Sequence, residues 1–174
     1  RQLAQEKGLF EKLERGEISN DAFLSSLQEF FFRKTILKKD LAKAWNALCY
    51  EAIPSDPIRL IKRMAKDYSC FLLSNTNALH LEKIKENSGR FSYKQFMKSF
   101  NACYLSHEMG SRKPENAFFE KVLTEQDLKA EECLFIDDRE ENIEAAKALG
   151  FKTCHFDPKK DNILLLNKKL KSFS

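Results

Sequence analysis

The chain has 174 residues, of which 43% are hydrophobic and 32% are charged. This is enough for one core domain of the size found in enzymes and a second, smaller domain. No stretch approaches the ~20 consecutive apolar residues of a membrane span, which argues against a membrane protein. The net charge is +4, and the lysines of residues 159–174 supply the excess, so we do not expect the spread basic surface of a nucleic-acid-binding protein.

Residues 1–52 have the periodicity of helices. Gly16 separates a first helix from a second, which Ser19 is expected to cap, and a third is expected over 39–50. The second helix carries an apolar stripe made of Phe23, Leu24, Leu27, Phe30 and Phe31. The proline-containing segment 52–57 then predicts a hinge, so we expect one part over 1–52 and a second over 53–174.

Beyond the hinge, helical and strand-like segments alternate. Strands are expected over 70–74, 102–106, 133–137 and 152–156, and helices over 57–67, 78–87, 115–124, 140–149 and 161–171. Gly150 is expected to end the helix over 140–149 as its C′ residue. Such alternation predicts an α/β fold with a parallel, Rossmann-like sheet.

Polar residues stand at or just after the ends of three of these strands. Ser74 and Asn75 end the first, and a hydroxyl beside free backbone N–H groups at a strand-to-helix turn suits an anion. Lys113 precedes a proline and a helix, where its ammonium group could reach a phosphate. Asp137 and Asp138 end another strand, and two adjacent carboxylates suit Mg²⁺. The alternatives are an ordinary helix cap, a solvated lysine and an acidic helix start.

The order of these groups resembles the haloacid dehalogenase (HAD) superfamily, from about Gly8 to Phe156. Ser74 resembles the second family motif, Lys113 the third, and Asp137-Asp138 the fourth. The sequences of these motifs are most similar to those of the helical-cap subgroup, which includes α-D-glucose-1-phosphate phosphatase and the N-terminal phosphatase domains of epoxide hydrolases. The subgroup phrases run over residues 14–19, 73–77, 104–106, 110–114 and 135–142.

The resemblance implies a Mg²⁺-dependent phosphatase that acts on a small phosphorylated metabolite through an aspartyl-phosphate. Ser74 and the Asn75 N–H would bind the phosphate, and Lys113 would neutralise its charge. Asp138 would bind Mg²⁺ directly, and Asp137 directly or through water. Residues 1–52 would form the cap, with Phe10, Glu14 and Arg15 near the leaving group. Residues expected to orient the site or line its rim are Asn142, Asn77 and Arg112.

One family motif is absent, the Asp-x-Asp-like sequence of the first strand, whose first aspartate is the nucleophile in the family. No substitute stands in these 174 residues, because Asp157 is followed two positions later by Lys159 and its strand already fits as the fifth. We expect roughly 30–50 further residues upstream of Arg1, which would supply one strand, one turn and the entry to the cap. The cap and the core would then both be incomplete here.

Two other readings stay open. A haloacid dehalogenase would need no Mg²⁺, although the Asp137-Asp138 pair argues against it. A non-catalytic HAD-like binding protein would lack the nucleophile altogether. The five cysteines include no C-x-x-C pair, which favours the reducing cytoplasm. The sequence names no oligomeric state and no single substrate.

Overall fold

The computed structural model describes residues 8–31, 35–47 and 52–161, so nearly all of the helix expected over 161–171 lies outside them. The chain divides into two compact units. The first, here called the β1 unit, comprises Arg1–Ile53, Phe71–Lys98 and Ala102–Arg112. The second, the β3 unit, comprises Pro54–Cys70, Ser99–Asn101 and Lys113–Ser174. The expected division at residue 52 stays a prediction.

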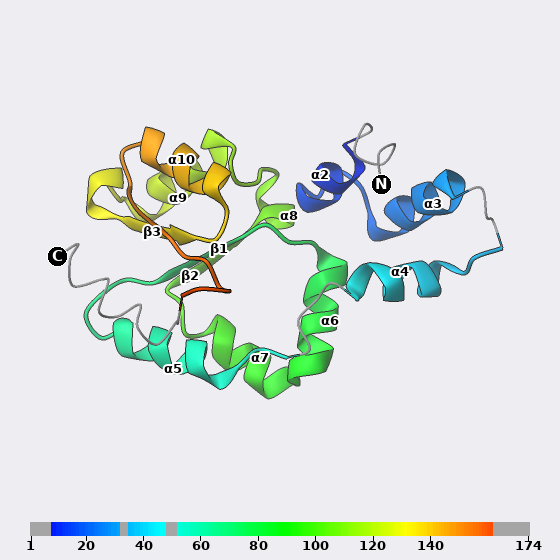
Figure 1. Ribbon diagram of the computed structural model, residues 1–174, viewed down its shortest axis with the longest axis horizontal. Helices are drawn as coiled ribbons and strands as arrows, with labels where there is room; N and C mark the ends of the chain where they lie inside the picture. The colour runs from blue at the N-terminus through cyan, green and yellow to red at the C-terminus, as the bar shows by residue number, and fades with distance from the viewer. Residues whose placement is uncertain (1–7, 32–34, 48–51, 162–174) are drawn as a thin grey trace. The chain divides into compact units, whose positions relative to one another are not determined.

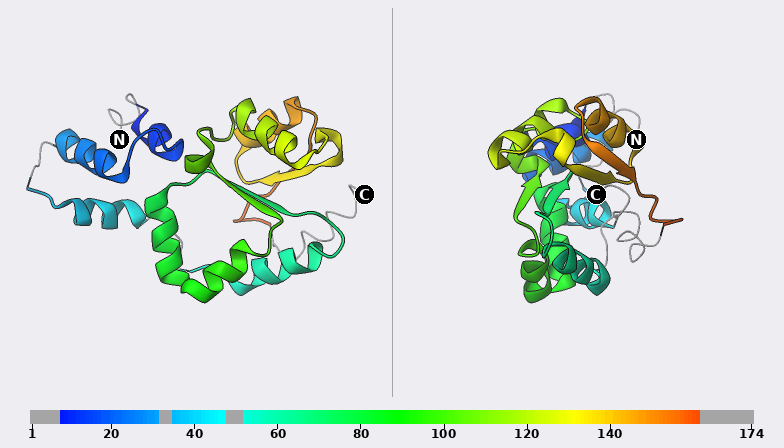
Figure 2. Two further views of the ribbon diagram at one scale, coloured as in Figure 1. Left: turned by 180° about the vertical axis from the view of Figure 1, so that it is seen from behind. Right: turned by 90° about the vertical axis from the view of Figure 1, so that its left-hand side faces the viewer.

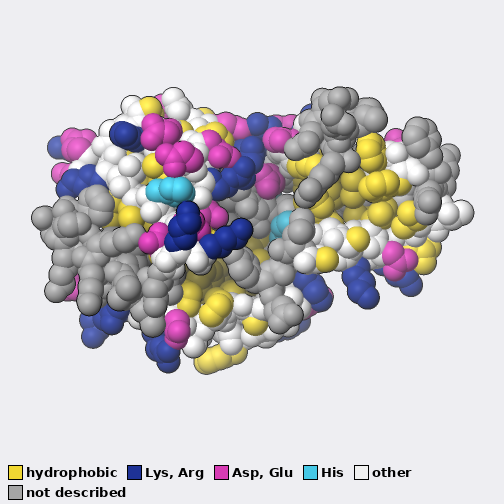
Figure 3. Space-filling view, in the orientation of Figure 1, with side chains coloured by type: hydrophobic (Ala, Val, Ile, Leu, Met, Phe, Trp, Pro, Cys, Tyr) yellow, Lys and Arg dark blue, Asp and Glu magenta, His cyan; other side chains and the backbone are white. Residues whose placement is uncertain are grey.

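Among the described residues, the β1 unit begins with the helices α2 (Leu9–Glu14), α3 (Asn20–Phe30) and α4 (Lys38–Asn46). Ser19 caps α3 as expected, because its Oγ accepts a hydrogen bond of 3.1 Å from the Ala22 N–H. The apolar sides of the helices form one cluster, whose buried members are Leu13, Phe23, Leu24, Leu27 and Leu41. Hydrophobic side chains are gathered over α3 and α4 in Figure 3.

The predicted stripe of α3 is confirmed for Phe23, Leu24 and Leu27, all of which are buried. It is wrong for Phe31, which is 49% exposed. Phe31 is the C-cap residue, where the regular turn that would carry the stripe onward has ended. The periodicity therefore held only as far as the helix itself.

The same unit contains a parallel strand pair, β1 (Phe71–Ser74) and β2 (Ala102–Leu105). Along the chain, α6 (Ala78–Ser88) and α7 (Arg90–Met97) come between the two strands, and α8 (Ser106–Met109) follows β2 directly (Figure 1). Segment 91–100, which the sequence left unassigned, is thus mostly helical, and α8 was not expected. The register places Ser74 opposite Leu105, so both strands end at the same edge.

The β3 unit contains the second parallel pair, β3 (Leu134–Asp137) and β4 (Lys152–His155). The helices described in this unit are α5 (Ser55–Met64), α9 (Asn116–Gln126), α10 (Glu140–Ala148) and a 3-10 turn, η1 (Ala130–Glu132). Gly150 follows α10 with φ +92°, as its expected C′ role requires. The views in Figures 1 and 2 show α9 and α10 beside these strands.

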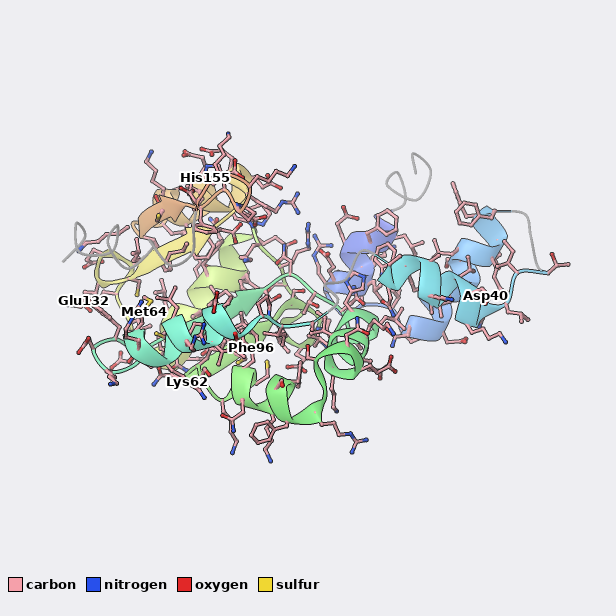
Figure 4. All side chains as sticks on the ribbon, turned by 60° about the horizontal axis from the view of Figure 1, so that its bottom comes forward. Asp40, Lys62, Met64, Phe96, Glu132 and His155 are labelled. Atoms are coloured by element: carbon pink, nitrogen blue, oxygen red, sulfur yellow. The ribbon has the colours of Figure 1, made fainter. Side chains whose placement is uncertain are left out.

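Strand alternation explains how the β3 unit is packed. Phe135 contacts Phe119 of α9 edge to face, with ring centroids 5.2 Å apart. Its neighbours Leu134 and Ile136 point the other way and pack with Leu60 of α5. The helix α5 is seen in Figure 4 with Lys62 and Met64 labelled. Both faces of β3 are therefore covered, as a parallel sheet requires.

Each strand keeps one unpaired edge in the part of the chain that the structure describes. Within the described ranges, β1 is hydrogen-bonded to β2 alone and β3 to β4 alone, so the parallel sheet expected as one body is present as two pairs. An unpaired edge leaves a row of backbone N–H and C=O groups without ladder partners. None of the helices in the described part of the chain is long and apolar enough to span a membrane.

Candidate active site

The C-terminal end of β1 is lined by neutral polar groups. Ser74 ends the strand, and the two residues after Asn75 are buried, Thr76 at 5% and Asn77 at 0% exposure. Asn77 caps α6, because its Oδ1 accepts a hydrogen bond of 3.0 Å from the His80 N–H. The Ser74 hydroxyl has no partner within the described residues and can donate to a ligand.

Ser106 fixes this turn and was missed by the sequence reading. It is fully buried, and its Oγ accepts from the Thr76 N–H and donates to the Thr76 carbonyl, both at 2.9 Å. The turn after β1 is thereby tied to the residue after β2. The available signal was position: Ser106 follows its strand at the edge where Ser74 ends the neighbouring one.

Asn77 keeps a second feature. Its Nδ2 is buried and has no hydrogen-bond partner in the described part of the chain. A buried amide donor without a partner costs about 1–3 kcal/mol. The sequence predicted that Asn77 orients the site or lines its rim, and the structure buries it fully as the N-cap residue of α6.

The C-terminal end of β3 is charged. The Lys113 ammonium group lies 2.6 Å from Asp137 Oδ2, and the two side chains are only 8% and 6% exposed. The other oxygen of Asp137 accepts from Asn142 Nδ2 and from the Arg139 N–H, each at 2.9 Å. The carboxylate is therefore fully engaged. Lys113 also lies 5.4 Å from the centre of the Phe135 ring.

These contacts set the protonation of Asp137. Burial alone raises the pKa of its carboxyl group, but the Lys113 charge and the hydrogen bonds from Lys113, Asn142 and the Arg139 N–H outweigh burial and hold the pKa below its usual range. Asp137 is thus anionic at neutral pH. Asn142, which is 2% exposed, donates a hydrogen bond to this carboxylate, and its role in orienting the site stays a prediction.

Asp138 differs from its neighbour in every respect. Its side chain is exposed and makes no hydrogen bond or ion pair within the described residues. Only its backbone is held, since the carbonyl oxygen lies 3.0 Å from His155 Nε2. His155, labelled in Figure 4 at the end of β4, also lies 3.1 Å from Glu140 through Nδ1. Asp138 can therefore offer both oxygens to a cation.

Arg112 lies in neither group. Its Nε–H donates to Glu14 Oε2 at 2.7 Å, and both side chains are largely shielded from solvent. The predicted residues thus fall into three sets: Ser74, Asn75 and Asn77 after β1; Lys113, Asp137, Asp138 and Asn142 around the end of β3; and Arg112 against α2.

Comparisons with known proteins now decide the family. The profile of the haloacid dehalogenase-like hydrolases matches residues 4–150. The chain belongs to this family. A D-ribitol-5-phosphate phosphatase of Bacteroides thetaiotaomicron is 28% identical over 146 residues, which are 84% of this chain and 70% of that protein.

Solved structures agree. A HAD family enzyme of B. thetaiotaomicron, crystallised as a magnesium complex, has a TM-score of 0.82 at 30% identity, and the match covers 91% of this chain and 79% of that one. A HAD-like hydrolase of Porphyromonas gingivalis has a TM-score of 0.82 at 32% identity and covers 95% and 80%. The HAD resemblance and the α/β fold expected from the sequence are confirmed, and the chain is that of a hydrolase.

Proposed function

We propose that the complete protein is a Mg²⁺-dependent phosphatase that acts on a small phosphate monoester, with a sugar or polyol phosphate as the favoured class. The observation that carries the proposal is the charged network at the end of β3. In this network the buried Asp137 carboxylate holds Lys113, and the next residue, Asp138, has a carboxylate that is not engaged. The named phosphatase relative supports the reaction, and its D-ribitol-5-phosphate supports the substrate class.

The carboxylates of Asp137 and Asp138 suit Mg²⁺, but they do not by themselves fill its coordination sphere. Asp138 has two available oxygens, whereas both oxygens of Asp137 already accept hydrogen bonds. We therefore assign Asp138 as the direct ligand and Asp137 as a carboxylate that acts through water. No group of three or more His, Cys, Asp or Glu able to hold a metal occurs in the ranges that the structure describes. We propose that a further ligand lies outside the described residues.

We propose that this ligand and the nucleophile lie on a strand upstream of Arg1. The unpaired strand edges support the idea, since each described strand pair can accept a further parallel strand. An aspartate at its C-terminal end would supply the carboxylate missing from the metal site. The same residue would accept the phosphoryl group, and water would then hydrolyse the aspartyl-phosphate.

The residues of this chain would bind and orient the phosphate. The Ser74 hydroxyl and the Asn75 N–H would donate to its oxygens, and Lys113, held in place by Asp137, would offset their charge. Bound Mg²⁺ would neutralise the developing negative charge. Asn77 would stabilise the turn after β1, and Asn142 would orient the Asp137 carboxylate at the end of β3. The helices α2 to α4 would form the cap that shields the reaction from water.

The test is phosphate release by the complete protein as Mg²⁺ is varied. Asp138→Asn should raise the Mg²⁺ concentration needed for half-maximal rate and lower turnover at limiting Mg²⁺ by about 10²-fold or more, because an amide cannot offset the cation. Asp40→Asn is the matched control, since Asp40 is exposed on α4 (Figure 4). Equal Mg²⁺ dependence in both variants would refute the assignment of Asp138.

The coding sequence before Arg1 tests the nucleophile. An aspartate ending an apolar, strand-like segment is expected there, and its replacement by asparagine should abolish phosphoenzyme formation. A complete protein without such a residue would favour the non-catalytic alternative. Dehalogenation without Mg²⁺ would favour the haloacid dehalogenase alternative.

A further inference from the structure

The end of α2 touches a distant part of the β1 unit at two points. Glu14 Oε2 accepts a hydrogen bond of 2.7 Å from Arg112 Nε, across 98 positions of sequence. Two residues after Glu14, the backbone of Gly16 lies against the carbonyl of His107 at the start of α8. Residues 14–16 thus hold the segment 107–112 near both of its ends.

The first contact is a shielded ion pair. The Arg112 and Glu14 side chains are 17% and 24% exposed, so water screens this pair less than it screens a more exposed pair such as Arg139–Glu141. A short bond between two ionised groups is also stronger than a neutral one. Removing one partner would leave a mostly buried charge without its counter-charge.

The second contact leaves no room for a side chain. A Cβ atom on Gly16 would lie 2.2 Å from the His107 carbonyl oxygen, which is backbone and cannot turn aside. Gly16 also has φ +70°, a conformation that residues with a Cβ rarely adopt. Glycine is therefore required on two independent grounds.

The held segment leads directly into Lys113. Between His107 and Arg112 the chain turns at Gly110, which has φ +70° and ends α8. Arg112 is bonded covalently to Lys113, so whatever fixes Arg112 also limits the backbone from which the Lys113 side chain extends. Glu14 lies on α2, a helix that shares no strand or turn with this segment.

We propose that Glu14 is a positioning residue for Lys113. It acts through Arg112, and together with the Gly16 contact it fixes segment 107–112 to α2. The structural half of the inference stands by itself, and its catalytic consequence rests on the proposed phosphatase function. The carboxylate of Glu14 is already committed to Arg112, so its task is to hold the loop and not to contact the leaving group.

The experiment compares Glu14→Gln with Glu17→Gln in the complete protein. Glu17 is a matched control, because it lies three residues away, is 47% exposed and pairs with Arg15 only at 3.8 Å. Two quantities are measured: hydrogen–deuterium exchange of residues 106–112, and kcat and KM for release of inorganic phosphate from a polyol phosphate. Glu14→Gln should speed exchange in that segment and lower kcat about tenfold with KM nearly unchanged, because small displacements of a catalytic group cost rate.

A double-mutant cycle with Arg112→Met sharpens the assignment. Glu14→Gln combined with Arg112→Met should lower kcat little more than Arg112→Met alone, since the two side chains act as one unit. Fully additive losses would overturn the proposal. So would a Glu14→Gln variant that matches Glu17→Gln in both measurements, or one that raises KM without faster exchange, because the latter marks a substrate contact.

The outcomes separate the two proposals. If the unmodified protein releases no phosphate, the proposed function fails, and exchange alone decides whether Glu14 fixes the segment. If the protein is an active phosphatase and Glu14→Gln speeds exchange but leaves kcat unchanged, the positioning role is overturned while the phosphatase function stands.

Discussion

The turn after β1 is held by neutral groups, whereas the turn after β3 is held by charged ones. Ser106 ties the first through two hydrogen bonds to Thr76, and Lys113 ties the second through its contact with Asp137. All four residues are buried or nearly so. A neutral hydrogen bond replaces a bond to water and adds little to the free energy of unfolding. Removing the partner of a buried charge lowers that free energy much more. The two turns should therefore respond very differently to the removal of one group.

The largest effect is expected from Lys113→Met. It leaves the Asp137 carboxylate buried with no cation, and breaking such a pair costs about 3–5 kcal/mol of unfolding free energy. Urea unfolding of the complete protein measures the loss. Lys147→Met is the control, because Lys147 is 65% exposed, lies 3.8 Å from Glu144 and should change stability by no more than about 0.5 kcal/mol. Similar losses in both variants would show that the Lys113 pair is not a buried one.

A smaller effect is expected from Ser106→Ala. The Thr76 N–H and carbonyl each lose their partner inside the protein, at a cost of about 1–3 kcal/mol. Ser26→Ala is the control, since the Ser26 hydroxyl bonds only to the Ala22 carbonyl of its own exposed helix. A loss as large as that of Lys113→Met would remove the contrast between the neutral and the charged turn.

The smallest expected effect is a pH dependence of the unfolding free energy. It arises from a histidine near the turn that neutral groups hold. Burial lowers the pKa of His80 below its ordinary value of 6.5, although a hydrogen bond to the Trp45 backbone opposes the shift. The native state thus keeps His80 uncharged where the unfolded chain binds a proton. Its contribution to stability is present above pH 6.5 and is lost as the pH falls from 6.5 towards the lowered value.

The measurement is the slope of unfolding free energy against pH between 7 and 5. His80→Gln should flatten this slope, because the glutamine side chain binds no proton in this range. Asp137 does not interfere, because its pKa lies below its ordinary value of 3.8, outside this range. Equal slopes would contradict the role given to His80, which stacks on Trp45 with ring centroids 5.2 Å apart.

Much of the framework follows from local sequence. Ser19 caps α3 and Gly150 ends α10 because caps depend on a few neighbouring residues. The strands ending at Ser74 and Asp137 are bounded by the change from apolar to polar residues, which needs no tertiary information. Parallel pairing followed from the alternation of helix and strand. The unexpected α8 has only four residues, too few for a periodic signal.

The contacts that join the predicted residues were decided by the tertiary structure alone. Lys113 meets Asp137 across 24 positions, Ser106 meets Thr76 across 30, and Arg112 meets Glu14 across 98. The sequence supplied most of these residues and the strand ends on which they stand, but no local pattern specifies which donor meets which acceptor. That choice depends on register, on the packing of helices against strands and on which charges burial forces together. The sequence therefore determined where the chemistry lies, and packing determined its partners.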